Sequence, residues 1–137
     1  SVTFLLGKLG AVAGTGFAAK LAPHGLTPRH CAVLELVSAE AMSQLDLARR
    51  IGVTPSVVGD MLDELEPLGA VRRTPDPSDR RRRILTLTAA GRRLHATAVA
   101  AAAAADDELL AGFAAADRAA LIHQLRAVGA AHGFDYS

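Results

Sequence analysis

The chain has little of what a disulfide-stabilised or sheet-rich protein needs. It contains one cysteine, Cys31, no tryptophan, and only 4% aromatic residues among 137. A single cysteine excludes an internal disulfide and a cysteine-based zinc cluster within one chain, and it is typical of the reducing cytoplasm. Because half of the residues are hydrophobic, the core must consist largely of Ala, Leu and Val, which favour close-packed helices. The composition predicts one mainly α-helical, cytoplasmic domain.

The chain also lacks a hydrophobic run that we expect to cross a bilayer. The stretch from Val2 to Ala22 is apolar, but Lys8 and four glycines interrupt it, and no basic segment precedes it. A secretory signal needs a basic segment before its apolar core, and a membrane-spanning helix needs about 20 predominantly apolar residues. We therefore expect neither a signal peptide nor contact with a membrane.

The net charge is only +1, but it is unevenly distributed. Residues 72–93 hold eight arginines against two aspartates, a local net charge of +6, whereas acidic residues predominate from Leu94 onward. Such a concentration of arginine is typical of a phosphate-binding surface. The alternative is a charged loop that is merely solvated.

Capping residues and apolar spacing predict four helices outside the central region of the chain. They cover about residues 4–22, 28–38 (with Thr27 as N-cap and a proline at the first helical position), 88–111 (with Thr88 as N-cap) and 115–131. The third of these is rich in alanine, which has the highest helix propensity. The last helix is expected to turn three apolar side chains inward: Leu121, Leu125 and Val128.

The central region has the signals of a helix-turn-helix motif. Ser43 is a predicted N-cap with an acidic residue, Asp46, three positions later, and Gly52 ends this short helix. Thr54 and Pro55 then repeat the cap-and-proline start at once. Two capped helices separated by a glycine turn are typical of a helix-turn-helix.

The second helix of this motif has one apolar stripe at helical spacing, formed by Val58, Met61, Leu62 and Leu65. If the stripe is buried, the opposite face is free to enter a DNA groove. That face carries Ser56, Gly59, Asp60 and Asp63.

A β-hairpin is predicted after this helix. Residues 70–74 and 82–87 are expected to form its strands, residues 75–79 its turn, and Leu85 and Leu87 one side of the second strand. The arginines would then lie at the tip of a projecting hairpin.

The predicted elements follow in the order helix, helix-turn-helix, hairpin and helices. This order and the motifs within it resemble the MarR family of bacterial regulators, and the resemblance extends over nearly the whole chain. The most specific signal is the segment from Asp76 to Arg81 followed by Leu87 to Gly91, which resembles the family's wing. The other matching segments are Gly25-Leu26-Thr27-Pro28 with Val33-Leu34, Gln44 to Val53 with Pro55-Ser56, and Leu65 to Arg73.

The resemblance implies a winged helix-turn-helix fold of about six helices and a two-stranded wing, organised as one domain over residues 1–137. Residues 1–25 and 106–137 would be dimerisation helices, 26–91 the winged helix-turn-helix lobe, and 88–111 a long connecting helix. The implied function is a homodimeric, sequence-specific transcriptional regulator, a repressor that binds a near-palindromic operator in double-stranded DNA and is released by a small-molecule effector. Relatives often release DNA when they bind a small phenolic or aromatic acid. No cofactor or metal is implied.

The resemblance also assigns roles in DNA binding. Arg81 matches an arginine that enters the minor groove and Asp79 an aspartate that braces it. Contacts to phosphates are expected from Arg72, Arg73, Arg80 and Arg82. Arg83 could equally be a strand residue that points outward and has no role in DNA binding. The expected DNA-binding residues are Thr54, Pro55, Ser56, Val57, Gly59, Asp60, Arg72, Arg73, Asp79, Arg80, Arg81 and Arg82.

The sequence departs from the family pattern on the predicted recognition helix. No Lys or Arg lies between Val53 and Val71, and four acidic residues lie there instead: Asp60, Asp63, Glu64 and Glu66. A carboxylate can accept a hydrogen bond from cytosine, but phosphates repel it. We therefore expect the wing to supply more of the affinity than usual.

Several alternatives remain at this point. Cys31 could be a peroxide-sensing thiol, although family sensors carry that cysteine on the first helix near tyrosines, and the only tyrosine here is Tyr136. A packed core cysteine is the preferred interpretation.

The five histidines contain no i, i+4 pair, so no metal site is predicted, and no catalytic set indicates an enzyme. The winged fold could also bind a protein instead of DNA. A weakly indicated effector cleft would be lined by Phe17, Leu21, His30, Cys31 and Leu34.

Overall fold

The structure, a computed structural model, describes residues 1–134 and forms two compact units, one from Ser1 to Ala105 and the other from Asp106 onward. Helices predominate, as the composition predicts. The first unit contains α1 (Val2–Leu21), the 3₁₀ turn η1 (Ala22–His24), α2 (Pro28–Ala39), β1 (Met42–Ser43), α3 (Gln44–Ile51), α4 (Pro55–Leu65), the 3₁₀ turn η2 (Glu66–Leu68), β2 (Val71–Asp76), β3 (Asp79–Leu87) and most of α5 (Ala89–Leu109). The second contains the end of α5 and α6 (Ala115–Ala131).

The predicted caps are confirmed, and they explain where the helices begin. The side-chain oxygens of Ser43, Thr54 and Thr88 accept hydrogen bonds from the backbone N–H groups three residues later, at 3.1, 3.3 and 3.0 Å. Each bond satisfies a donor that a helix start leaves free. Gly52 ends α3 in the left-handed conformation, with φ of 84°, which a residue with a side chain rarely adopts. The helix-turn-helix is therefore fixed by local interactions.

The core of the first unit lies where α2, α3, α4 and the base of the sheet meet. Every member of the predicted α4 stripe is at most 4% exposed, and Leu85 and Leu87, predicted to share one side of their strand, are both buried. Its fully buried large side chains are Leu21, Val33, Leu34, Leu47, Val58, Leu62, Leu65 and Leu85.

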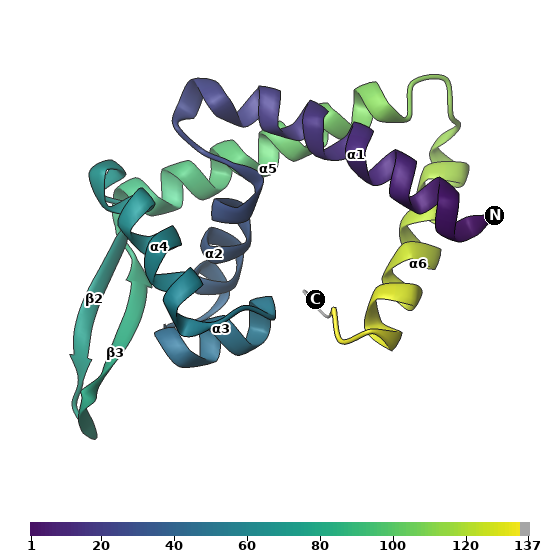
Figure 1. The fold of residues 1–137 in the computed structure, drawn as a ribbon. Helices are drawn as coiled ribbons and strands as arrows, with labels where there is room; N and C mark the ends of the chain where they lie inside the picture. The colour runs from purple at the N-terminus through teal and green to yellow at the C-terminus, as the bar shows by residue number, and fades with distance from the viewer. Residues whose placement is uncertain (135–137) are drawn as a thin grey trace. The chain divides into compact units, whose positions relative to one another are not determined.

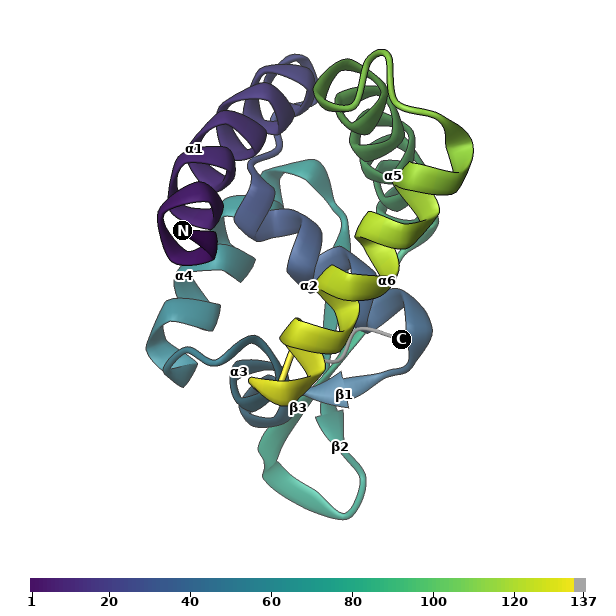
Figure 2. The same ribbon diagram turned by 90° about the vertical axis from the view of Figure 1, so that its right-hand side faces the viewer.

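The wing differs from the prediction in two respects. Its sheet has three strands in the order β1-β3-β2, because Met42 and Ser43 pair with Leu85 and Ile84. A two-residue strand is too short to show periodicity, so no local pattern indicated β1. The turn is also shorter than predicted, because β2 continues to Asp76 and β3 begins at Asp79. Arg72 and Arg73 therefore lie on β2, whereas Arg80 to Arg83 follow the turn directly, near the end of a hairpin that projects beyond α3 and α4 (Figures 1 and 2).

Helix α1 and the second unit expose their apolar side chains. Contrary to the prediction that they face inward, Leu121, Leu125 and Val128 of α6 are 40–51% exposed in the single chain. The expectation that no run is long enough for a membrane span is also wrong by length and composition, because the helical segment of residues 2–24 is long enough and contains an 18-residue stretch with a mean hydropathy of 1.4. The exposed large apolar residues of α1 are Val2, Phe4, Leu5, Leu6, Leu9 and Val12. The last three residues, including Tyr136, lie outside the described residues.

Candidate nucleic-acid interface

Helix α4 presents a polar face opposite its buried stripe. Thr54, Pro55, Ser56 and Asp60 are exposed, whereas Val57 and Gly59 are half-buried. At Gly59 a Cβ atom would lie 3.3 Å from Nε2 of Gln44, a side chain that in turn donates to the carbonyl of Pro55 at 3.3 Å. The residues predicted to approach DNA from this helix thus occupy its first two turns, and α3 packs closely behind Gly59.

Two of the four acidic residues on or next to α4 bind cations of the protein itself. Oδ1 of Asp63 lies 3.0 Å from a guanidinium nitrogen of Arg73 on β2. The carboxylate of Glu64 lies 2.6 Å from Arg29 and 2.5 Å from Nε2 of His30, both on α2. The hydrogen bond with His30, and then the charge of Arg29, hold the pKa of Glu64 below its usual value. These acids therefore tie α4 to β2 and α2.

His30 is a buried connection between two helices. It is 3% exposed, and its Nδ1 accepts the backbone N–H of Thr27 at 3.0 Å while Nε2 faces Glu64. Because Nδ1 accepts a hydrogen bond, the ring hydrogen lies on Nε2, which donates to the carboxylate. Sequence reasoning missed this role, although the position of His30 three residues after the Thr27 cap was a signal for a capping box.

The wing has its own internal ion pairs. The guanidinium of Arg82 lies 3.3 Å from Asp46 on α3 and 3.9 Å from Asp76. Asp76 also accepts the backbone N–H and hydroxyl of Ser78 at 2.9 and 2.8 Å, which close the turn and lower the pKa of this carboxyl. These contacts hold β3 against the start of α3.

The arginines of the hairpin fall into two groups. Arg73 and Arg82, both predicted phosphate contacts, already bind acidic side chains. Asp79 accepts the backbone N–H of Arg81 at 3.0 Å, a bond that shapes the strand at this point. The second group consists of exposed side chains that have no ion pair within residues 1–134: Arg72, Arg80, Arg81 and Arg83. The hairpin therefore presents four unneutralised guanidinium groups beside α4.

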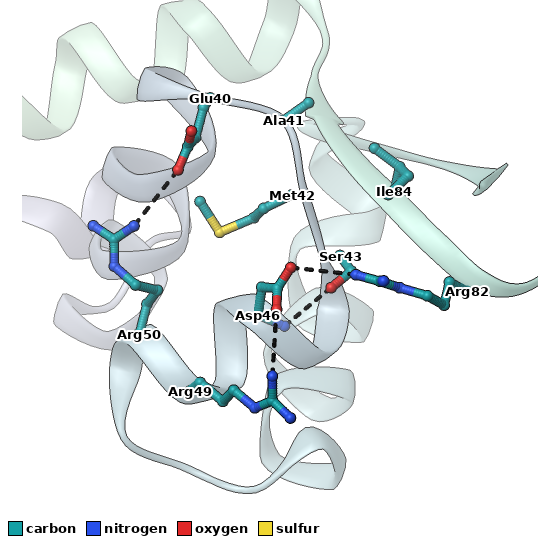
Figure 3. A pocket seen from close by; sticks show the side chains of 9 residues that line it. All are labelled: Glu40, Ala41, Met42, Ser43, Asp46, Arg49, Arg50, Arg82 and Ile84. Carbon is teal, nitrogen blue, oxygen red and sulfur yellow. Dashed lines mark hydrogen bonds and ion pairs between the residues drawn. The ribbon is translucent and has the colours of Figure 1, made fainter. Parts of the chain in front are cut away.

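A pocket of about 440 Å³ lies between α3, β1 and β3, but its charges are already satisfied (Figure 3). Arg50 pairs with Glu40 at 3.6 Å, and Asp46 pairs with both Arg49 and Arg82. None of the predicted effector residues lines it.

The predicted effector residues lie mostly in the core. Leu21 and Leu34 are fully buried and His30 nearly so, while Phe17 and Cys31 are partly exposed and pack against the core. Burial raises the pKa of the Cys31 thiol, and its Sγ donates to the carbonyl of Thr27 at 3.6 Å. A raised pKa disfavours the nucleophilic thiolate, which agrees with a packed cysteine.

Comparison with known proteins gives consistent similarities. The profile described as the MarR family matches residues 24–82. The HTH-type transcriptional repressor Rv2887 of Mycobacterium tuberculosis is 39% identical over 92 residues, which span 66% of this chain and 66% of Rv2887. The solved structure of Rv2887 in complex with DNA is 34% identical, with a TM-score of 0.79 over 94% of this chain and 98% of that chain. The repressor CouR of Rhodococcus jostii RHA1, bound to a 23-mer DNA duplex, is 32% identical, with a TM-score of 0.86 over 94% of this chain and 92% of that chain.

Proposed function

The chain belongs to the MarR family, and from this premise we propose that it is a sequence-specific transcriptional repressor, which binds duplex DNA as a homodimer in the cytoplasm and is released by a small-molecule effector. The proposal involves no chemical reaction, so no residue is assigned a catalytic role. Its support comes from one arrangement in particular, the unneutralised guanidinium groups on the hairpin next to the polar face of a capped helix.

This arrangement suits B-form DNA in both shape and charge. A helix of the width of α4 fits the major groove, and a projecting hairpin reaches the minor groove beside it. We assign Arg81 to the minor groove, where a guanidinium group meets concentrated negative potential, and Arg72 and Arg80 to phosphates. Arg82 binds Asp46 and Arg73 binds Asp63, so we assign both arginines to positioning the wing. They would approach phosphates only with the guanidinium nitrogens that face away from these carboxylates.

A second copy of the chain is the proposed cover for the exposed apolar faces of α1 and α6. Monomeric proteins rarely expose apolar patches of more than a few hundred Å². The apolar length of α1, which satisfies the criteria for a membrane span, is then explained by burial against a partner chain. A twofold dimer would present two copies of α4 to successive major grooves of a near-palindromic operator.

Small aromatic or phenolic compounds are the proposed effector class. Solved structures of Rv2887 hold p-aminosalicylic acid and salicylic acid, and CouR holds p-coumaroyl-CoA. In this chain Phe17 and Cys31, at the edge of the core, would contact the effector, with Leu21, His30 and Leu34 behind them.

The test is a titration of labelled duplexes, selected from a random pool, with the wild-type protein and two variants at fixed salt. Arg81→Ala should lose at least tenfold in affinity, because it removes the minor-groove cation. Arg93→Ala removes the same charge from an exposed position on α5 and should bind within about twofold of wild type. Equal affinity of all three proteins would remove the wing from the mechanism, and failure of the wild type to enrich any duplex would refute DNA recognition.

A further inference from the structure

We propose that Asp60 selects a cytosine in each half of the operator, an inference that rests on the proposed function. The acidic character of α4 is otherwise unfavourable for a helix that enters a groove between phosphates. The positions and partners of its carboxylates indicate which of them is available to DNA.

Asp60 lies at the centre of the exposed face of α4. It is two residues from both Val58 and Leu62, so at about 100° per residue its side chain points roughly 160° away from each of them. Both of these residues are buried in the core. Asp60 is exposed and has no hydrogen bond or ion pair within the described part of the chain. The side chain is therefore aimed at whatever α4 faces.

The neighbouring acids on the same helix are not free in this way. Arg73 neutralises Asp63 at 3.0 Å, and Arg29 neutralises Glu64, which is also hydrogen-bonded to His30. Glu66 is exposed but belongs to η2, beyond the end of α4. Asp60 is thus the one carboxylate of α4 that meets DNA with its charge uncompensated by the described residues.

The major groove offers few partners to a carboxylate. Guanine presents only acceptors there and thymine an acceptor and a methyl group, so both repel or fail to bind an acid. Adenine has a donor at N6, but the acceptor N7 lies beside it. Cytosine presents the N4 amino group with no acceptor of its own next to it, so a carboxylate binds it best. Asp60 would consequently favour cytosine and also exclude the other bases.

The experiment is selection of bound duplexes from a random pool by the wild-type dimer, Asp60→Ala, Asp60→Asn and Glu66→Gln. The wild type should enrich cytosine at one symmetry-related position per half-site, and replacing that base pair should weaken binding about 5- to 150-fold. Asp60→Ala should lose the preference at that position alone, and Asp60→Asn should shift it toward adenine, which an amide binds through N6 and N7. Glu66→Gln removes the same charge and should keep the wild-type preference.

The possible failures are distinguishable. If the wild type enriches an operator and Asp60→Ala enriches the same bases at every position, the role of Asp60 is refuted while the DNA-binding function stands. If Glu66→Gln loses the cytosine preference as well, the effect is one of general charge and the specific contact is refuted. If the wild type enriches nothing, the proposed function itself fails.

Discussion

Replacement of Gly91 by alanine should destabilise the lobe, although alanine is the better helix former. Gly91 is the third residue of α5, and a Cβ atom there would lie 2.0 Å from the carbonyl oxygen of Ala70 and 2.9 Å from its carbonyl carbon. An ordinary carbon–oxygen contact is about 3.3 Å, so the two backbones would have to separate by roughly 1.3 Å. The obstacle is main chain, which cannot rotate away as a side chain can.

The magnitude follows from what holds Ala70 in place. Its carbonyl accepts the backbone N–H of Thr88 at 3.0 Å, and the hydroxyl of Thr88 donates to the adjacent carbonyl of Gly69 at 2.5 Å. Loss of these bonds costs about 1 kcal/mol each, and overpacking adds about 1–3 kcal/mol. The gain in helix propensity is at most about 1 kcal/mol. The net expectation is a loss of about 2–4 kcal/mol in the free energy of unfolding.

Urea unfolding at a fixed protein concentration measures this loss. With a slope near 2 kcal/mol per M, the midpoint of Gly91→Ala should fall by about 1–2 M. Arg92→Ala is the matched control, because Arg92 follows Gly91 in α5 but is exposed, so this variant should unfold near the wild-type midpoint. A midpoint for Gly91→Ala at or above that of wild type would show that the close contact between α5 and Ala70 is absent in solution.

Three further outcomes are expected. The pKa of Glu64 is lowered in the folded state, so its ionised form stabilises the fold above the ordinary carboxyl pKa, and this stability is lost as the pH falls through the lowered value. In urea titrations between roughly pH 3 and pH 7, Glu64→Gln should therefore lose less stability on acidification than wild type. Parallel curves for the two proteins would contradict this. Cys31 should react with iodoacetamide at neutral pH more slowly than free cysteine, because burial raises its pKa, whereas rapid sulfenate formation with loss of DNA binding would establish a thiol sensor. Leu125→Asp should convert the dimer to monomers in sedimentation experiments, since it places a charge in the proposed interface; an unchanged dimer would assign α6 to another role.

Local signals in the sequence were sufficient for most of the fold. Ser43, Thr54 and Thr88 act as caps at the predicted positions, and the stripe on α4 is buried as its spacing indicates. Strand β1 and the short turn of the wing were missed. A two-residue strand exists only because β3, about 40 residues later, supplies its partner. No local pattern records that pairing.

The candidate site was only partly accessible to the same reasoning. The sequence identified the arginine-rich wing and raised the question of why α4 is acidic. It did not show that Arg82 would bind Asp46, or that His30 and Arg29 would bind Glu64, because these partners are 34–36 residues apart. Ion pairs of this kind depend on how the elements pack, and the same set of charged residues is compatible with many different pairings.

The amino-acid sequence by itself determined the order and limits of the helices, the capped helix pair and the concentration of arginine on one hairpin, since each depends on residues within a turn or two of one another. Only the tertiary structure decided which charges remain available. It pairs Asp63, Glu64, Arg73 and Arg82 internally and leaves Asp60 and Arg81 exposed. The physical reason is that a charge is neutralised by what packs beside it, and that neighbour is set by the fold and not by position along the chain.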